Sequence, residues 1–199
     1  MRSILVFVVL VSLAVPVSAE PPKNYAQIRQ QIAVVAKPDG SRIASSSPIA
    51  ETKYMSRAMN GGHESRTAFA YVSKREAAPA SVSIVATRID VLFHTEIQNF
   101  DGANAPPKSG SGVIGDPWRN VPYNLLDNSI KCGASSEQMC MWTRTYQFNL
   151  SAEDVRAVLA AKRKILPVST DSRWTEWTMP LDHLSATLDA LGVLAEFQG

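Results

Sequence analysis

Residues 141–161 read MWTRTYQFNLSAEDVRAVLAA, and this stretch decides the predicted fold. In the first half of the stretch, every second residue is large, and most of these are aromatic. Strand side chains point to opposite faces with a period of two, so these residues share a face. One face therefore carries Trp142, Arg144, Tyr146 and Phe148. Because three of these four residues are aromatic, we expect that face to be buried. The apolar residues of the second half recur at helical spacing, which predicts a strand that runs directly into an amphipathic helix.

The junction between the two periods carries a helix-start signal. Ser151 can accept the amide of Asp154, and the pair forms an S-x-x-D capping box. Leu150 before the cap and Val155 after it can pack as a hydrophobic staple. We therefore expect the helix to begin immediately after Ser151.

A second junction of the same kind follows in the sequence. When the chain is aligned with itself at a shift of 29 residues, Phe148 matches Trp177. The shift places Ser151 on Pro180, a residue suited to the first turn of a helix. Gly192 is placed to end this second helix. Duplication and chance similarity both account for the match, and both predict two helices that each follow a strand. The second helix has one apolar stripe, formed by Leu181, Leu184, Leu188 and Leu191.

The first residues, 1–19, have the features of a secretory signal peptide. Arg2 provides a positive start, an apolar core follows, and Val17-Ser18-Ala19 forms a small-residue cleavage site. The alternative is a membrane anchor, but the apolar run ends short of the ~20 residues that a spanning helix needs. We therefore predict a secreted or periplasmic protein without stable membrane insertion once the signal is removed. Residues 20–199 then form a single domain.

The two cysteines are Cys132 and Cys140. In an exported chain, an even number of closely spaced cysteines favours a disulfide. The pair lacks the C-x-x-C spacing of redox-active sites, and no histidine lies nearby in sequence to complete a zinc site. The sequence therefore predicts a structural disulfide.

The clearest strand signal outside the opening stretch is residues 81–100, which contain no glycine or proline. Thr87 and the apolar residues at 85, 89, 91, 93 and 97 share one face, which is predicted to be buried. Arg88, Asp90, His94 and Glu96 predict a face in contact with water. With the two helices near the carboxyl end, the pattern favours an α+β fold. We expect a mostly antiparallel sheet of four to six strands, with two C-terminal amphipathic helices packed on one face.

Residues 101–122 are dense in glycine and proline, which predicts a long loop. Trp118 and Tyr123 lie at its end, and rigid aromatic side chains on such a loop suit contact with a partner. Residues 123–130 are predicted to form a helical turn. Within the loop, residues 110–115 match the G-x-G-x-x-G motif. Dinucleotide binding is not expected, because that motif requires a strand before it and a helix after it.

His94 and Glu96 are the candidate residues for metal or hydrolytic chemistry, and His63 could add a ligand. No H-E-x-x-H spacing or G-x-S-x-G elbow accompanies them. A polar, solvent-facing strand is the better explanation of His94 and Glu96, because such residues are ordinary on a solvated strand face. The sequence therefore predicts neither a catalytic residue, nor a metal site, nor a cofactor.

The charge balance also restricts the function. The chain has 20 Lys and Arg against 18 Asp and Glu, so it is close to neutral and lacks the basic surface of a nucleic-acid-binding protein. The leading hypothesis is an exported, non-catalytic protein that binds a protein or small-molecule partner through Trp118, Tyr123, His94 and Glu96. The alternatives are a hydrolase that uses His94 and Glu96, and a structural module that assembles through an exposed strand edge.

Overall fold

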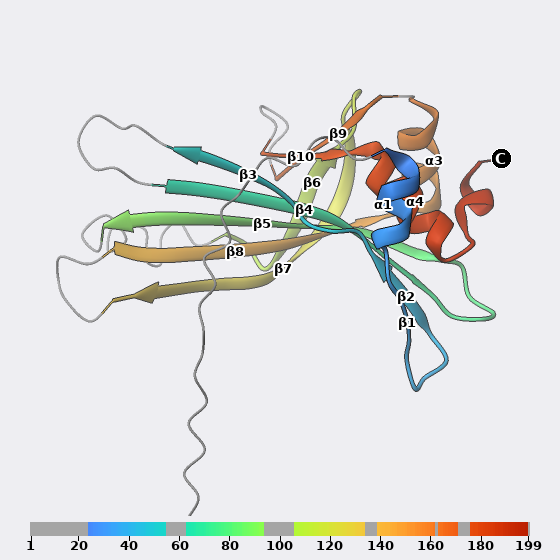
Figure 1. Cartoon of the computed structure of the whole chain (residues 1–199). Coiled ribbons are helices and arrows are strands. Elements are labelled where there is room, and N and C mark those ends of the chain that lie inside the picture. Colours follow the sequence, from blue (N-terminus) through green and yellow to red (C-terminus); the bar gives the residue numbers. More distant parts are fainter. Residues whose placement is uncertain are drawn as a thin grey trace, which may run out of the picture.

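The computed structural model describes residues 24–54, 63–93, 106–133, 139–161, 163–170 and 176–198. Within these ranges, ten strands form one antiparallel sheet that short helices accompany (Figure 1). In chain order the elements are α1 (Tyr25–Gln31), β1 (Val34–Ala36), β2 (Arg42–Ser45), β3 (Ile49–Tyr54), β4 (His63–Lys74), β5 (Ser81–Phe93), β6 (Ser109–Ile114), β7 (Arg119–Cys132), β8 (Met139–Leu150), α3 (Ala152–Ala160), β9 (Ile165–Ser169), β10 (Trp177–Pro180), α4 (Leu181–Ala190) and the 3₁₀ helix η1 (Leu194–Phe197).

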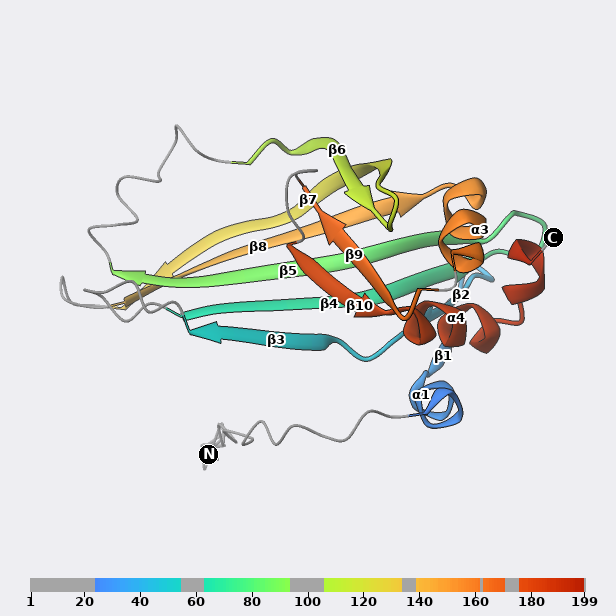
Figure 2. The same ribbon diagram turned by 90° about the horizontal axis from the view of Figure 1, so that it is seen from above.

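The sheet is rolled over itself. Its strand order is β1-β2-β4-β5-β8-β7-β6-β9-β10, with β3 paired to β4. The long strands β4, β5, β8 and β7 form the central part. The short hairpin β9–β10 crosses above them, and β10 contacts β4 (Figure 2). The two ends of the strand order therefore enclose a space between the hairpin and the long strands.

Aromatic side chains fill that space. Trp177 of β10 is 2% exposed, and its ring centroid lies 5.6 Å from that of Tyr146 and 6.1 Å from that of Phe148. The indole Nε1 of Trp177 donates to the carbonyl of Thr87 in β5 at 3.0 Å. The aromatic face predicted for residues 142–148 is therefore buried, and it packs against the second aromatic strand.

Both predicted strand-to-helix junctions are present. The Ser151 hydroxyl accepts the Asp154 amide at 3.1 Å, and the Asp154 carboxylate accepts the Ser151 amide at 3.1 Å, which completes the capping box of α3. After α4, Gly192 has φ +71° and its amide donates to the carbonyl of Asp189. Such a positive φ favours glycine and ends the helix. Among the described helices, none combines the length and apolar character needed to cross a membrane.

The predicted fold class is wrong in the extent of the sheet. Instead of four to six strands beneath two helices, the described residues form a ten-stranded antiparallel sheet with short helices. Several strands have only three to six residues, such as β1, β6 and β10. Strands of this length contain too few alternations to give a clear period of two.

The faces of β5 were also assigned incorrectly. Val82, Ile84 and Ala86 lie on the core side and are at most 2% exposed. Arg88 and Asp90 continue this side, and Asp90 is 3% exposed rather than in contact with water. On this face residues 82, 84, 86 and 90 are buried and Arg88 is partly buried, so polarity alone indicated the wrong side.

The Gly/Pro-rich segment is not one continuous loop. Residues 109–114 form β6, and the predicted helical turn at 123–130 belongs to β7. Gly112 lies in β6, where an added Cβ would come 2.5 Å from a Phe148 ring carbon and 2.7 Å from the Ser169 carbonyl oxygen. Glycine is therefore required for close packing of the strand against the core, rather than for a mobile loop or for phosphate binding.

The predicted disulfide joins Cys132 and Cys140, which are register partners at the ends of β7 and β8. The bond covalently links these two strands at the end of the sheet farthest from α3 (Figure 1). The sequence prediction of a structural disulfide is confirmed.

Gly112→Ala should destabilise the protein by about 1–3 kcal/mol, because the added methyl group overpacks the contact with Phe148. Urea unfolding measured by circular dichroism gives the free energy of unfolding. Ser111→Ala, on the exposed neighbouring residue of the same strand, is the matched control and should change it little. Equal stability of Gly112→Ala and the wild type would show that β6 does not pack over Phe148.

Candidate functional site

A pocket lies where the turn between β6 and β7 meets α3. The end of β6 pairs with the end of β9, and Figure 2 shows this pair of strands on the side of the molecule where α3 lies. The pocket is partly open to solvent and has a volume of about 70 Å³. We call it the turn pocket; its lining residues are Gly115, Asp116, Pro117, Arg119, Ala157, Val158, Ala161, Arg163, Ile165, Leu166 and Leu181.

Backbone contacts fix the turn that forms one wall. Gly115 has φ +77°, a conformation that favours glycine, and a cis peptide bond joins Asp116 to Pro117. The Gly115 amide donates to the carbonyl of Pro167 in β9 at 3.0 Å. The turn is therefore tied to the strand that forms the opposite side of the pocket.

Arg119 connects the turn to α3. Its Nε donates to Asp154 Oδ1 at 2.9 Å, and its Nη2 donates to Glu153 Oε1 at 2.8 Å. Burial acts to raise the pKa of the Asp154 carboxyl, but hydrogen bonds from Ser151 and Arg119 outweigh it and hold the pKa below its usual value. Asp154 is therefore ionised at neutral pH. Its carboxylate both caps α3 and holds Arg119 in place.

The floor of the turn pocket is apolar and its rim is charged. Val158 and Leu166 are buried beneath it, whereas Ile165 is 54% exposed at its edge. On the rim, Arg163 and Asp116 form an ion pair at 3.1 Å, with side chains 62% and 61% exposed. This arrangement suits an apolar group that enters the floor while a polar group stays at the rim.

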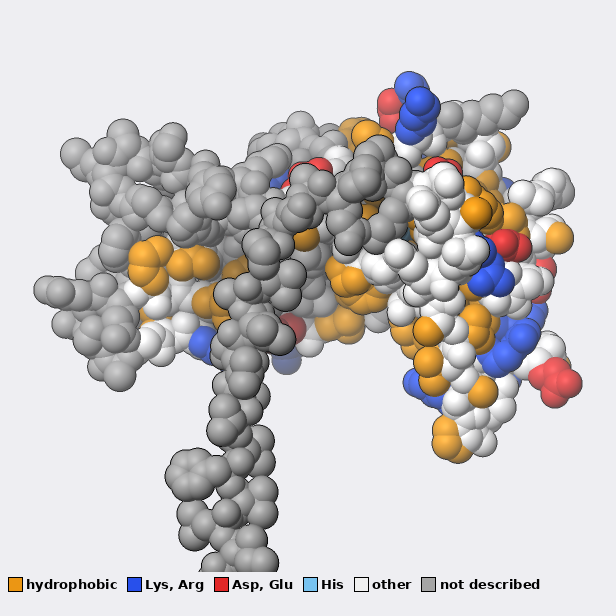
Figure 3. Space-filling model, in the orientation of Figure 1, with side chains coloured by type: hydrophobic (Ala, Val, Ile, Leu, Met, Phe, Trp, Pro, Cys, Tyr) orange, Lys and Arg blue, Asp and Glu red, His pale blue; other side chains and the backbone are white. Residues whose placement is uncertain are grey.

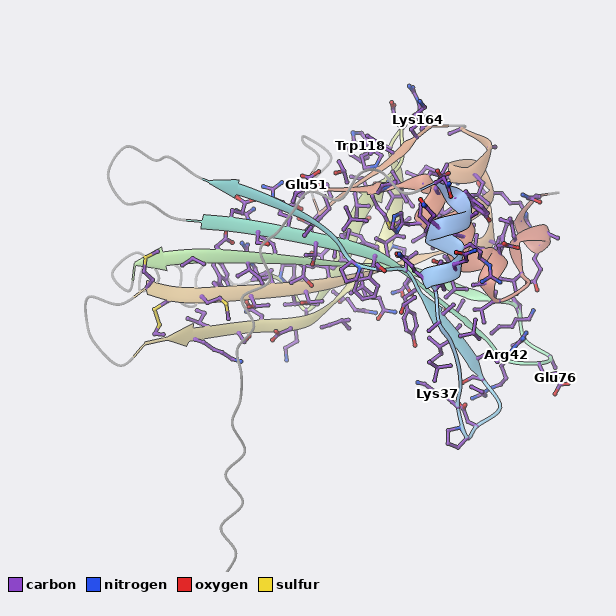
Figure 4. All side chains as sticks on the ribbon, in the orientation of Figure 1. Lys37, Arg42, Glu51, Glu76, Trp118 and Lys164 are labelled. Atoms are coloured by element: carbon purple, nitrogen blue, oxygen red, sulfur yellow. A yellow bond between two sulfur atoms is a disulfide. The ribbon has the colours of Figure 1, made fainter. Side chains whose placement is uncertain are left out.

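Trp118 and Tyr123, the two aromatic residues predicted to contact a partner, differ in exposure. Trp118 belongs to the turn and is 38% exposed; Figure 4 shows it at the margin of the molecule where Lys164 also lies. Tyr123 is only 6% exposed, and its ring lies edge-on to Tyr146 at 5.4 Å. Burial raises the pKa of the Tyr123 phenol, and the nearby Glu176 adds to the effect. Tyr123 is a core residue, so only Trp118 is available for contact.

His94 and Glu96 lie outside the described residues. His63 begins β4, but its side chain is also outside the described set. Within the part of the chain that the structure describes, no group of three His, Cys, Asp or Glu residues is placed to hold a metal ion. The described structure therefore gives no geometry for the hydrolase hypothesis.

Sequence reasoning did not identify Arg119, Arg163 or Ile165 as site residues. In the sequence, Arg163 is one of three consecutive basic residues at the end of the first predicted helix, where positive charge complements the helix dipole. Arg119, Arg163 and Ile165 come from different elements, and only the roll of the sheet brings them together. The signal present in the sequence was a basic residue, Arg163, followed two positions later by an isoleucine, Ile165.

A second polar cluster occupies the charged end of the core face. Arg66, Arg88 and Arg144 are direct register partners on β4, β5 and β8. Like charges placed opposite one another destabilise a sheet unless carboxylates separate them. Glu64 and Asp90, themselves register partners and each 3% exposed, provide those carboxylates. We call these five residues the arginine row.

Each guanidinium of the arginine row has an acidic partner. Arg88 donates from Nε to both Asp90 oxygens, at 3.1 and 3.0 Å, and from Nη2 to Glu64 at 3.1 Å. Arg66 pairs with Glu64, and Arg144 pairs with Asp90. Burial acts to lower the pKa of Arg88, but Asp90 and Glu64 outweigh it and raise the pKa above its usual value. The row is therefore a charged and mutually neutralising network.

Arg144 is the least satisfied member of the row. Its guanidinium carbon lies 4.0 Å from the centroid of the Trp142 ring, and its Nε is buried without a hydrogen-bond partner in the described structure. Glu64 and Asp90 balance two of the three guanidiniums, and Glu176 Oε1 lies 4.0 Å from Arg88 Nη1 and balances the third, so the row offers little attraction for an anion. We therefore assign the row to structure and regard the turn pocket as the candidate functional site.

No protein-family model, curated protein or solved structure matches this chain.

Arg88→Met should cost about 1.5–3 kcal/mol of unfolding free energy, because it removes the hydrogen bonds that Arg88 donates to two buried carboxylates, which keep Arg66 and Arg144 as partners. The matched control is Arg75→Gln, which removes an exposed pair with Asp39 and should cost about 0–1 kcal/mol. Urea unfolding of both variants at neutral pH tests the difference. Similar small losses in the two variants would mean that water solvates the arginine row.

Proposed function

We propose that this chain is an exported, non-catalytic binding protein that holds one apolar side chain of a partner protein in the turn pocket. The observation that carries the proposal is the pairing of an open apolar floor with exposed Trp118 and Ile165 beside it. Binding energy at protein interfaces concentrates where a side chain fills a desolvated pocket near aromatic residues.

The size of the turn pocket favours a side chain over a free small molecule. Its volume of about 70 Å³ is well below the ~300–1,000 Å³ of pockets that enclose drug-sized ligands. A branched aliphatic side chain is a suitable occupant, since the floor consists of aliphatic residues. The rim would then contact the backbone on either side of that residue.

Export agrees with the amino-terminal sequence and with the disulfide. Residues 1–19 carry the pattern of a cleavable signal, and Cys132 and Cys140 are bonded. Disulfides persist in oxidising compartments such as the periplasm and the extracellular space. We place the partner in the same compartment.

Peptides selected for binding from a random displayed library should bind the wild-type protein but not Trp118→Ala or Ile165→Asp. Ile165 lines the turn pocket, and Trp118 lies between the lining residues Pro117 and Arg119 in sequence. Both side chains are exposed, so folding should be retained. Loss of one central contact typically weakens binding by about 2 kcal/mol or more, roughly thirtyfold. Fluorescence anisotropy with labelled peptides gives the dissociation constants.

The matched control for this binding test is Val35→Asp, which introduces the same charge at a residue that is 56% exposed on the distant strand β1. It should bind the peptides as the wild type does. Circular dichroism verifies that all three variants are folded. Peptides that bind equally to Ile165→Asp and to the wild type would exclude the turn pocket as the binding site.

A second candidate function is assembly through a strand edge, and β1 favours it. The β1–β2 hairpin projects from the body (Figure 1), and Figure 3 shows hydrophobic side chains along it. Val34 and Val35 are 41% and 56% exposed. The Lys37 amide bonds to the Ser41 carbonyl, so by antiparallel alternation the backbone groups of Val34 and Ala36 point away from β2. These outward groups can pair with a second copy.

Assembly through β1 predicts self-association that Val35→Lys abolishes, because a charged residue on an edge strand opposes pairing. Sedimentation velocity at increasing protein concentration measures it. Leu126→Lys, at a residue 55% exposed on β7, is the matched control. A wild-type protein that sediments as a monomer throughout would contradict edge assembly and leave the turn-pocket proposal unaffected.

A further inference from the structure

We infer that the turn pocket recognises the carboxyl-terminal residue of its partner, with an aliphatic side chain in the floor and the terminal carboxylate at the rim. The inference rests on the proposed function and adds the chemistry of the partner. It follows from the charges that line the turn pocket and from the ion pair that closes its rim.

The lining of the turn pocket carries more positive than negative charge. Arg119 and Arg163 both line it, whereas Asp116 is the one carboxylate among its lining residues. Glu153 and Asp154 neutralise Arg119 through its Nε and Nη2, but neither acid lines the turn pocket. Because Arg119 is already paired, Arg163 is the guanidinium that an incoming carboxylate can engage, in place of Asp116.

The Asp116–Arg163 ion pair is easily exchanged. Both side chains are more than half exposed, and exposed pairs contribute little because water and salt screen them. Arg163 makes no other ion pair within the described residues. A partner carboxylate can replace Asp116 on the Arg163 guanidinium without breaking any buried contact.

A terminal residue satisfies both halves of the turn pocket at once. Its carboxylate and its side chain leave the same Cα, so one residue can occupy the floor and the rim. A residue inside a chain would present a neutral amide to Arg163 and would need space for backbone in both directions. The small volume of the turn pocket therefore favours a chain end.

The test compares the peptide acetyl-Gly-Gly-Leu with a free carboxyl end against the same peptide with an amidated end. Titrations followed by ¹H–¹⁵N NMR give both the dissociation constants and the residues that shift. We expect the acid to bind about fivefold more tightly than the amide, the upper range for one exposed ion pair. The backbone amide signals of residues 115–119, apart from Pro117, should move. The preference for the acid over the amide should fall as salt is added.

Two variants with opposite expected effects test the charge assignment. Arg163→Gln should remove the preference for the acid. Asp116→Asn should tighten binding of the acid severalfold, because it removes the carboxylate that competes for Arg163. Arg75→Gln is the matched control, since the exposed Arg75–Asp39 pair also spans 3.1 Å and lies elsewhere on the protein. It should leave both constants unchanged.

Each other outcome has a distinct meaning. Equal binding of acid and amide, with no effect of the charge variants, overturns the terminal-carboxylate inference but leaves the proposed function if library peptides still require Ile165. Tighter binding by isovalerate, a free aliphatic carboxylate, overturns the assignment to a protein terminus. If neither these peptides nor the library peptides contact residues 115–119, both proposals fail.

Discussion

The contact of Trp177 with the long strands is the interaction on which the rest of the structure depends. The indole donates to the Thr87 carbonyl and packs against Tyr146 and Phe148, so it attaches the β9–β10 hairpin to the central sheet. A buried aromatic side chain combines a large apolar area with a defined geometry. Once the hairpin is held there, β9 lies next to β6 and the start of α4 lies beside the end of α3. The turn pocket is a consequence of this arrangement.

Charged residues serve two different purposes in the molecule, and burial distinguishes them. The carboxylates of the arginine row are almost fully buried, where removing one partner of a charge pair is costly. The pair at the rim of the turn pocket is largely exposed, where an ion pair contributes little and exchanges partners readily. The first group is suited to holding the rolled sheet together. The second is suited to recognition.

The turn pocket combines features that suit the binding of a partner's side chain. It offers an aliphatic floor, two guanidiniums and one carboxylate, and the exposed Trp118 adjoins its lining residues in sequence. Its walls are tied by the Gly115 amide and by Arg119, so it exists before a partner arrives. A preformed site reduces the cost of ordering on binding. This supports a small recognition site within a larger contact surface.

The sequence alone determined the features that depend on neighbouring residues. The change of period at Ser151, the capping box with Asp154 and the glycine after α4 are local, because their hydrogen bonds join residues a few positions apart. The disulfide was predictable for the same reason, since its cysteines are eight residues apart. Tertiary structure alone decided the rest. Gly112 is needed in β6 because Phe148, distant in sequence, packs against it, and Asp90 is buried in contact with Arg88 and with Arg144 of β8. The turn pocket joins residues from four elements, and no local pattern records which segments a rolled sheet will bring together.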